Sequence, residues 1–486
     1  MVVEILGAKM LSPFVGMSHF VWTAQIAVTL VALACGYYAG GRLADRSQNL
    51  GWLYWAIITA AGYLALTVVI CKPMAYWCLD FNLAIGALLA STILFFIPLA
   101  LLAITGPFLV RVLTSSVSGV GGNVGRLTSL STVGSFAGTM LIGYLMLPRL
   151  PNSVTMYLTA MALLLVCVGY FGIFARKRVG PLLAVLALGA ATGLLLLRGQ
   201  SQEYRELVEL YRCNSDFGQL QVMGQREGSS LYYLNDNLYQ DGFDLERKQS
   251  VFAFTYMLAG LARAYTTNIS DALCIGLGVG VVPMDFARQG AHVDVVEINP
   301  AVVPVATNYF GLDPKMLRIT IDDGRHFLNR CTKQYDVVIL DAFLGDSSPS
   351  HLMTREAFTA MRHVLRPGGT LVINAFADLN DGRDFFASSL DKTLKTVFAG
   401  VRIHSAGGQI YLVATDRPDP VFVHPPDLAV VHPEAKYNVL SAFANIAETI
   451  PGHGQVLTDD YNPVEYYDAG NREKLRKELA ISAKSM

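Results

Sequence analysis

Four short segments in the C-terminal half carry the residues best suited to chemistry, and each follows a run that reads as a β-strand. The glycines of the first segment let a ligand approach the backbone closely. The acids of the other three can accept hydrogen bonds from a ligand or take up a proton. Because ligands of open parallel sheets bind outside the carboxyl ends of the strands, we predict one nucleoside site made by Gly276, Gly278, Gly280, Glu297, Asp323, Gly324 and Asp341.

The strand that each acid follows indicates its role. Glu297 ends the second strand, where a carboxylate can accept both ribose hydroxyls, and Asp323 follows the third, where it can meet an adenine amino group. Asp341 ends the fourth strand and should face the reacting centre. NAD is the competing cofactor, but the turn lacks the complete G-x-G-x-x-G because position 281 is valine. The pattern therefore favours S-adenosylmethionine over a dinucleotide.

Strands and helices alternate from residue 271 onward, which indicates a mostly parallel sheet with helices on both faces. The expected strands are "DALCIGLG", "HVDVVEIN", "LRITIDDG", "YDVVILDAF", "GGTLVINAF", "VRIHSA" and "QIYLVATD", the last two forming an antiparallel edge hairpin. Residues 212–244 suit a small antiparallel sheet. We predict an α/β Rossmann-like domain of the class I methyltransferase type, preceded by a small N-terminal β-sheet.

The first 199 residues have a different composition, with 11 Lys/Arg against 3 Asp/Glu, whereas the rest of the chain holds 26 against 35. A helix needs about 20 apolar residues to cross a bilayer. Residues 4–17 are too short and suit a re-entrant or interfacial piece. The sequence therefore predicts a multi-pass α-helical membrane domain, with spans near 20–40, 51–71, 81–105, 127–147, 153–174 and 180–197.

The predicted link between the third and fourth spans, "RVLTSSVSGVGGNVGRLTSLSTVGSFAG", is rich in small residues. Such residues serve close helix packing in lipid, and a gating or substrate-lining loop is the alternative. Pro98 should kink the third span rather than end it. Lys and Arg in the loops place the first, third and fifth loops in the cytoplasm. Six spans would then put the C-terminal domain outside, away from cytoplasmic nucleoside cofactors, so its side stays open.

Several segments together resemble the spermidine synthase (polyamine aminopropyltransferase) family, and in particular its membrane-fused bacterial branch. They are "VWTAQIAVTLVALACGYYAGGRLADR", "LYYLNDNLYQDGFD", the glycine turn, "IDDGRHFL", "YDVVILDAFLGDSSPSHLMTREAF" and "LTDDYNPVEYY". The resemblance implies transfer of an aminopropyl group from decarboxylated S-adenosylmethionine to an amine such as putrescine, with release of methylthioadenosine. It implies a role in polyamine biosynthesis.

The resemblance also assigns residues to the amine. Gln240 matches the glutamine of the family's gatekeeping D-G-x-x-Q segment, in which Asp236 also lies. Asp341 matches the first aspartate of the catalytic D-S-S-D loop. Near the C-terminus, Asp460 and Glu465 form an acidic, aromatic cluster with Asp459 and its neighbouring tyrosines. This cluster reads either as one wall of a cation-binding cleft or as a solvated tail.

Several positions depart from the family pattern. Val279 stands where the family's aspartate holds the amine of the decarboxylated cofactor, and without that charge the site could accept intact S-adenosylmethionine. Leu344 replaces the second aspartate of D-S-S-D, the usual proton acceptor, and Asp346 is the candidate substitute. Phe254 and Gly260 replace a tyrosine and a histidine. His351, near this loop, reads as a general base or as a surface histidine.

Three functions remain open: an aminopropyltransferase using Asp341 and Asp346, a membrane-tethered methyltransferase, and a non-catalytic nucleoside-binding scaffold. The expected partners are a small amine and the lipid bilayer of the cell (inner) membrane; a homodimer is left open. The net acidic C-terminal half argues against nucleic acid, and no cluster shows metal-ligand spacing. The expected domains are a transmembrane domain (1–199), a small β-domain (200–250) and a spermidine-synthase-like domain (251–486).

Overall fold

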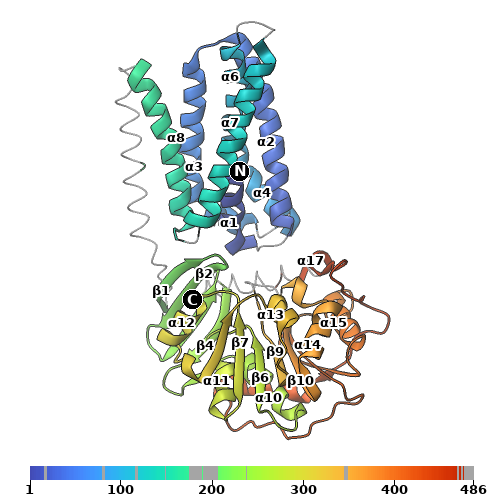
Figure 1. Cartoon of the computed structure of the whole chain (residues 1–486). Coiled ribbons are helices and arrows are strands. Elements are labelled where there is room, and N and C mark those ends of the chain that lie inside the picture. Colours follow the sequence, from blue (N-terminus) through green and yellow to red (C-terminus); the bar gives the residue numbers. More distant parts are fainter. Residues whose placement is uncertain are drawn as a thin grey trace. The chain divides into compact units, whose positions relative to one another are not determined.

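The computed structural model divides the chain into two compact units, Met1–Gln202 and Glu203–Met486 (Figure 1). The structure describes residues 1–15, 19–78, 81, 83–114, 119–147, 149–174, 189, 206–236, 238–343, 349–467, 470, 471 and 474. Each unit has its own hydrophobic core.

The N-terminal unit is entirely helical over its described residues. Its helices are α1 (Val2–Val15), α2 (His19–Arg46), α3 (Leu50–Cys78), α4 (Leu83–Ser91), the π-helical turn η1 (Thr92–Phe96), α5 (Ile97–Ala103), α6 (Thr105–Leu113), α7 (Val120–Met140), the π-helical turn η3 (Leu141–Met146) and α8 (Asn152–Phe174). Five stretches of the described chain are long and apolar enough to cross a membrane. They are Phe20–Arg46, Leu50–Cys78, Ala84–Leu113, Val120–Met146 and Asn152–Phe174. The predicted sixth span, 180–197, lies outside the described residues except for Gly189.

The small-residue link predicted between the third and fourth spans is wrong for most of its length. Gly121, Gly122 and Gly125 belong to α7, which begins at Val120. Glycine costs a helix about 1 kcal/mol per residue in water. In an apolar phase, however, the backbone must satisfy its own polar groups, and a helix does so. Residues 115–118 of the link lie outside the described part of the chain.

The helix continues past Pro98, as predicted, and the freed carbonyl groups have other partners. Proline has no N–H to donate to the carbonyl four residues earlier, which is that of Leu94. The hydroxyl of Thr67 on α3 donates to Leu94 O at 3.2 Å, and the Tyr63 hydroxyl donates to Ile93 O at 2.6 Å. The irregular π-helical turn therefore lies against the two hydroxyls of a neighbouring helix, which satisfy its backbone.

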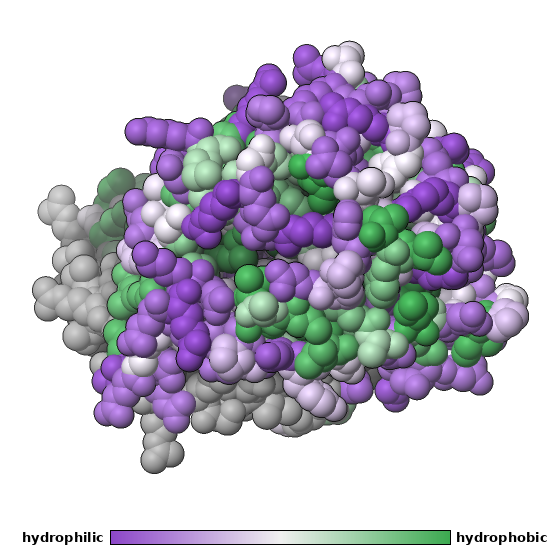
Figure 2. Space-filling view, turned by 90° about the horizontal axis from the view of Figure 1, so that it is seen from below, coloured by the Kyte–Doolittle hydropathy of each residue, from purple (hydrophilic) through white to green (hydrophobic). Residues whose placement is uncertain are grey.

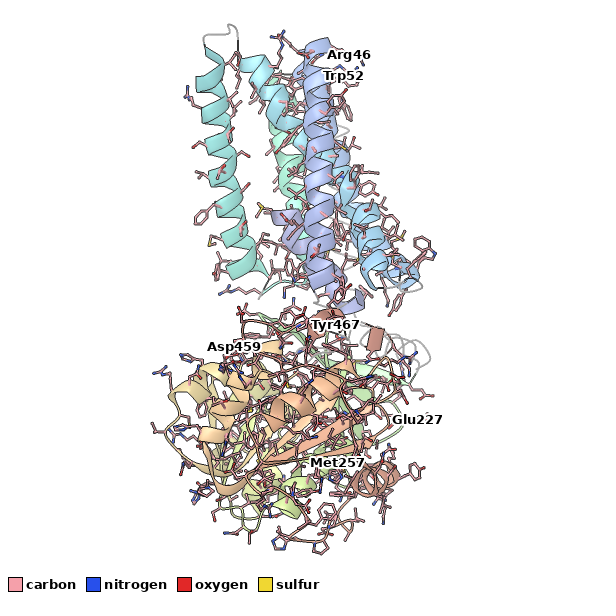
Figure 3. The ribbon with its side chains drawn as sticks, turned by 90° about the vertical axis from the view of Figure 1, so that its right-hand side faces the viewer. Arg46, Trp52, Glu227, Met257, Asp459 and Tyr467 are labelled. Atoms are coloured by element: carbon pink, nitrogen blue, oxygen red, sulfur yellow. The ribbon has the colours of Figure 1, made fainter. Side chains whose placement is uncertain are left out.

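Helix α2 packs closely along the segment formed by α4 to α6 because glycines face it. A Cβ atom at Gly36 would lie 2.2 Å from Ala100 O, and one at Gly40 would lie 2.7 Å from Ile104 O. Arg46 and Trp52, at the end of α2 and the start of α3, lie at the same end of this unit (Figure 3). A basic residue beside an exposed tryptophan is typical of a membrane boundary.

The C-terminal unit holds the two predicted sheets. The small sheet has the order β1 (Leu207–Ser215), β2 (Gly218–Gln225), β3 (Ser230–Asn235), β4 (Leu238–Asp244) and β5 (Gln249–Ser250). The large sheet has the order β13 (Ile446–Ala447), β11 (Gly400–Ala406), β12 (Gln409–Thr415), β10 (Leu365–Phe376), β9 (Tyr335–Leu340), β6 (Asp271–Ile275), β7 (His292–Glu297) and β8 (Leu317–Ile321). All seven predicted strands of this sheet are present.

The large sheet is parallel from β10 through β9, β6 and β7 to β8, while β10–β12 and β11–β12 are antiparallel. Helices cover both faces, as predicted. One face carries α10 (Ala253–Tyr265), α11 (Val281–Arg288), α12 (Val302–Tyr309) and α16 (Pro433–Ala444). The other carries α13 (Gly324–Arg330), α14 (Arg355–His363) and α15 (Phe385–Lys395). The parallel strands therefore bring their carboxyl ends to one edge.

The small sheet shares its core with the large one. Val222 and Tyr233 of the small sheet belong to the same buried cluster as Val295 of β7, and the ring of Tyr211 lies 5.6 Å from that of Tyr309 on α12. The face shown in Figure 2 carries many hydrophilic residues, with hydrophobic residues in groups between them.

The contact at Gly36 generates a stability prediction. Replacing Gly36 by Leu should lower the stability of the full chain in detergent by about 1–3 kcal/mol, because the added side chain meets the backbone of Ala100. Thermal unfolding measures this loss. Gly62→Leu on α3 is the control, since nothing lies within 4 Å of a Cβ at that position. Equal effects of the two variants would contradict the close contact.

Candidate active site

A cavity of about 800 Å³ opens at the carboxyl ends of β6, β7 and β9. The small sheet supplies part of its wall through β3 and β4, and α10 supplies another part. Its aromatic side chains are Phe217, Tyr233, Tyr239, Phe252, Phe254, Phe343, Phe376 and Phe386. Its acidic side chains among the described residues are Asp241, Glu297, Asp322, Asp323, Asp341, Asp378 and Glu465.

The glycine turn after β6 lines the cavity next to the end of β9. Gly276 has φ +100°, and a Cβ atom there would lie 2.1 Å from the carbonyl oxygen of Asp341, so the backbone at this position requires glycine. Gly278 also lines the cavity. Gly280 does not line it; it precedes α11 and faces Leu312, which a Cβ atom would approach to 2.5 Å.

Glu297 lines the cavity from the end of β7 and is held by the backbone. Its Oε2 accepts a hydrogen bond from the Leu277 N–H at 3.0 Å, and its Oε1 accepts one from the Asn299 N–H at 2.8 Å. Burial raises the pKa of Glu297 above its ordinary value. Each carboxylate oxygen keeps a second lone pair, which leaves Glu297 able to accept hydroxyl groups.

Asp323 lines the cavity and also begins α13. Its Oδ1 accepts hydrogen bonds from the N–H groups of Arg325 and His326, and its Oδ2 lies 2.9 Å from His351 Nε2. Burial alone would raise the pKa of Asp323, but the bonds from the His326 backbone and the His351 side chain bring it below its ordinary value. Gly324 follows, where a Cβ atom would lie 2.6 Å from the Ile275 side chain. Asp323 is therefore a hydrogen-bond acceptor whose orientation is fixed by its partners.

Asp341 lines the cavity directly after β9 and has one side-chain hydrogen-bond partner among the described residues. Asn374 on β10 donates from Nδ2 to its Oδ1 at 2.9 Å. Burial raises the pKa of Asp341 to about 6. The rings of Phe343 and Phe376 meet edge to face near this strand end, with centroids 5.3 Å apart. Asp346, the predicted substitute base, lies outside the described residues.

A second acid in the cavity, Asp241, was missed from sequence. It is only 3% exposed, and its Oδ1 accepts hydrogen bonds from the Gly242 N–H at 2.8 Å and from Ser250 Oγ at 3.3 Å. Burial raises its pKa to about 8, and the nearby charge of Asp341 contributes. Sequence alternation would place Gln240 and Asp241 on opposite faces of a strand.

A bulge overrides that alternation. In the pairing of β3 with β4, Tyr233 faces Asp241 and Leu234 faces Tyr239, so Gln240 is the extra residue. A bulge reorients its neighbours and can bring successive side chains to one side. As a result Gln240 and Asp241 both line the cavity. The "Q-D-G" triplet was the only available signal, since glycine in a strand often marks a bulge.

Of the other residues predicted to bind the amine, some line the cavity and some do not. Glu465 lines the cavity, whereas Asp236 and Asp460 are not among the described residues that do. The Asp236 Oδ1 instead accepts a hydrogen bond from the Gln219 N–H at 2.9 Å, and Asp460 is exposed. Asp459, labelled in Figure 3, pairs with Arg325 at 3.0 Å. Of the departures noted above, Phe254 lines the cavity, while Val279 and Gly260 do not.

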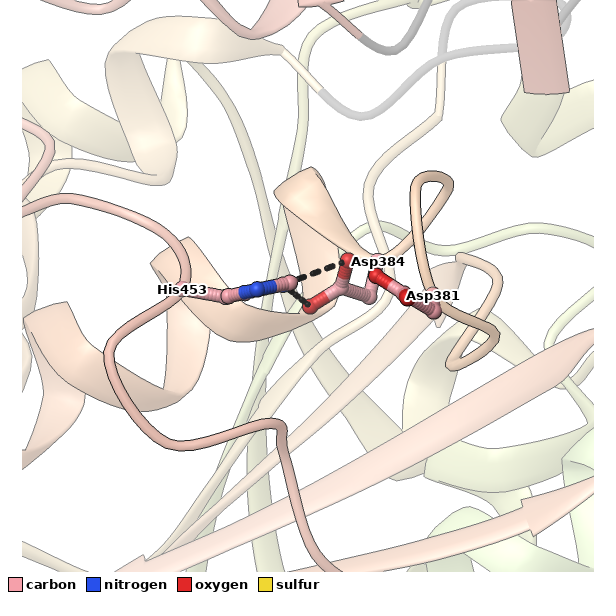
Figure 4. Close-up of side chains that lie close together, drawn as sticks. All are labelled: Asp381, Asp384 and His453. Atoms are coloured by element: carbon pink, nitrogen blue, oxygen red, sulfur yellow. Dashed lines mark hydrogen bonds and ion pairs between the residues drawn. The ribbon is translucent and has the colours of Figure 1, made fainter.

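Within the described chain, the group with metal-ligand chemistry lies apart from the cavity lining and consists of Asp381, Asp384 and His453 (Figure 4). Asp384 already accepts hydrogen bonds from Ser388 Oγ at 2.5 Å and from His453 Nδ1 at 3.1 Å. Asp384 and His453 are therefore already hydrogen-bond partners of each other. The expected absence of a metal in the reaction stays a prediction.

A Rossmann-like sheet with a glycine turn after its first strand and acids after the next three is the architecture of class I methyltransferase-type domains. Residues 251–407 match the family model of the spermine/spermidine synthase domain. This match confirms the predicted resemblance to the spermidine synthase family. The membrane-fused branch stays a prediction.

Curated relatives of two activities align with this region. The chain is 38% identical over 146 residues to a polyamine aminopropyltransferase of Vibrio vulnificus, covering 29% of this chain and 47% of the relative. It is 33% identical over 140 residues to an N-terminal histidine N-methyltransferase of Emericella nidulans, covering 28% and 24%. The chain thus spans less than half the length of either relative.

Solved structures also align with the chain. Spermidine synthase from Thermotoga maritima has a TM-score of 0.40 at 19% identity, covering 49% of this chain and 84% of that one. Human methyltransferase-like protein 13 has a TM-score of 0.31 at 20% identity, covering 41% and 96%.

The buried acid generates a pH prediction. The folded protein holds the Asp241 proton up to about pH 8, whereas the unfolded chain releases it near its ordinary pKa of 3.8. Ionisation therefore costs the folded state stability as the pH rises. Asp241→Asn should gain about 2–3 kcal/mol over the wild type between pH 6 and pH 8. Thermal unfolding of the full chain at both pH values measures this, with the exposed Asp216→Asn as control; a gain that shrinks with rising pH would contradict the burial.

Proposed function

We propose that the C-terminal unit transfers an aminopropyl group from decarboxylated S-adenosylmethionine to a small amine such as putrescine. The observation that carries this proposal is Asp341, a carboxyl with a raised pKa that faces the cavity at the end of β9. It lies against the glycine turn, in the position from which a base can reach a nucleophile beside a nucleoside. The family match and the aminopropyltransferase named among the relatives support the same reaction.

The chemistry needs a neutral amine, a sulfonium and a proton acceptor. The lone pair of the amine nitrogen attacks the methylene carbon bonded to sulfur, and the carbon–sulfur bond breaks. Its electron pair goes to sulfur, which leaves as the neutral thioether methylthioadenosine. The nitrogen becomes an ammonium, and the Asp341 carboxylate takes its proton. Asn374 orients this carboxylate through the hydrogen bond to Oδ1.

The rest of the cavity suits the two substrates. Glu297 would bind the ribose hydroxyls and Asp323 the adenine side, each oriented by backbone N–H groups. Acidic side chains with aromatic walls favour cations over anions. Gln240 and Glu465 would then contact the amine substrate from the cavity wall.

A methyltransferase that uses intact S-adenosylmethionine is the second candidate. Two observations favour it: the glycine turn has valine at position 279, and one relative is named an N-methyltransferase. The same base could serve an amine that attacks the methyl carbon. S-adenosylhomocysteine would then be the product.

The membrane part of the proposal concerns the N-terminal unit. Five stretches of its described chain are apolar enough to span a bilayer. We infer that they anchor the enzyme in the cell (inner) membrane, where the amine and the bilayer are its partners. Close glycine packing between α2 and its neighbours suits a stable anchor.

Product analysis tests the reaction. The purified full chain, given decarboxylated or intact S-adenosylmethionine with a panel of amines, should release methylthioadenosine from the decarboxylated form only. Asp341→Asn should lower kcat about 10²-fold or more, because it removes the proton acceptor. Since the carboxylate is the active form, the wild-type rate should rise as the pH passes about 6.

Mass spectrometry identifies the nucleoside, and Asp216→Asn serves as the control for loss of a carboxylate outside the cavity lining. S-adenosylhomocysteine as the product would favour the methyltransferase. A protein that binds the nucleoside but forms neither product would contradict both the aminopropyltransferase and the methyltransferase proposals.

A further inference from the structure

Val279 cannot supply the carboxylate that the family's aspartate has at this position, but another acid lies nearby on a different element. Val279 is buried and does not line the cavity, so the glycine turn itself offers no acid to a ligand. Asp241 comes from β4 of the small sheet and lines the same cavity. Its Oδ2 is the nearest heavy atom to the point where a Cβ of Gly278 would lie, at 4.0 Å. A carboxyl group therefore lies beside the turn after all.

The carboxyl of Asp241 is held in one orientation. The Gly242 N–H and the Ser250 hydroxyl both bind Oδ1, and Ser250 is itself fixed by the Phe252 N–H, which donates to its Oγ at 3.1 Å. Oδ2 is the oxygen on the side of Gly278. The bulge at Gln240 produces this orientation, because it turns Asp241 into the cavity.

We propose that Asp241 binds the ammonium group at the end of the aminopropyl chain and so selects decarboxylated over intact S-adenosylmethionine. The proposal rests on the proposed function in assigning the cavity to an S-adenosyl ligand. It makes the small sheet, rather than the glycine turn, the source of cofactor selectivity.

The two ligands differ by one charge at this place. The decarboxylated form ends its chain in an ammonium alone, whereas the intact form carries a carboxylate on the same carbon. A carboxylate brought next to Asp241 meets like charge when Asp241 is ionised and finds no counter-charge when it is protonated, and Asp341 also faces this poorly solvated site. An ammonium in the same place neutralises Asp241. Charge alone therefore favours the decarboxylated ligand.

Binding of the ammonium should also release a proton. Asp341 after β9, Tyr233 on β3 and Tyr256 on α10 interact electrostatically with Asp241, and the described residues that shift the pKa of Asp241 include no cation. Burial raises the pKa of Asp241 to about 8, so the acid is mostly protonated in the empty cavity at pH 7. A bound ammonium favours the carboxylate, and the proton leaves to solvent.

Calorimetric titration of the full chain in detergent, without amine so that no transfer occurs, tests the selectivity. The ligands are decarboxylated S-adenosylmethionine, intact S-adenosylmethionine and methylthioadenosine, which has no aminopropyl chain. The wild type should prefer the decarboxylated form at least tenfold over the intact one. Asp241→Asn should remove that preference and leave the Kd of methylthioadenosine within twofold, while Asp216→Asn should change none of the three.

The proposal would be overturned by a wild type that binds intact S-adenosylmethionine at least as tightly, or by an Asp241→Asn variant that keeps the preference. A variant that loses methylthioadenosine as well would show a general effect on the cavity and would also overturn it. This test and the transfer assay can fail independently. If the protein selects the decarboxylated ligand but releases no methylthioadenosine, the inference about Asp241 holds and the proposed function is contradicted.

The same titration in buffers of different ionisation enthalpy measures the proton. At pH 7 the wild type should release close to one proton per decarboxylated ligand bound, and Asp241→Asn should release almost none. Proton release that is unchanged in the variant would assign it to another group and contradict the role of Asp241.

Discussion

The close contact between the glycine turn and the end of β9 is the constraint on which the site depends. Gly276 leaves no room for a side chain because the carbonyl oxygen of Asp341 occupies that place. The turn that would hold a nucleoside and the acid that would take a proton are thereby fixed against each other by backbone. The parallel register of β6 with β9 and β7 sets this geometry, since it ends neighbouring strands at one edge.

The acids near this contact differ in their hydrogen bonding and in their pKa values. Glu297 and Asp323 accept hydrogen bonds from backbone N–H groups and act as oriented acceptors. Asp241 and Asp341 have few donors and carry raised pKa values. Environments that separate the pKa values of neighbouring acids are typical of sites that bind cations and move protons. The small sheet takes part directly, because Asp241 comes from it and its core is continuous with that of the large sheet.

The N-terminal unit is an apolar helix bundle in which backbone carbonyl groups near Pro98 need hydrogen-bond donors. Glycines let α2 approach its neighbour closely, and the hydroxyls of Thr67 and Tyr63 serve the carbonyls near Pro98. The hydroxyls pair these carbonyls without introducing charge, and the glycines allow close helix packing. A bundle of this kind is suited to holding an enzyme at a membrane.

The sequence by itself determined the sheet strands, the apolar helices and the acids at the strand ends. These features are local: strand and helix periods, glycines after strands and long apolar runs can be read along the chain. Only the tertiary structure decided which acids share the cavity. Asp236 and Asp460 are near the predicted motifs but do not line the cavity, while Asp241 does. For Asp241 the physical reason is a one-residue bulge in the pairing of β3 with β4, which changes the face on which its side chain lies and depends on the partner strand.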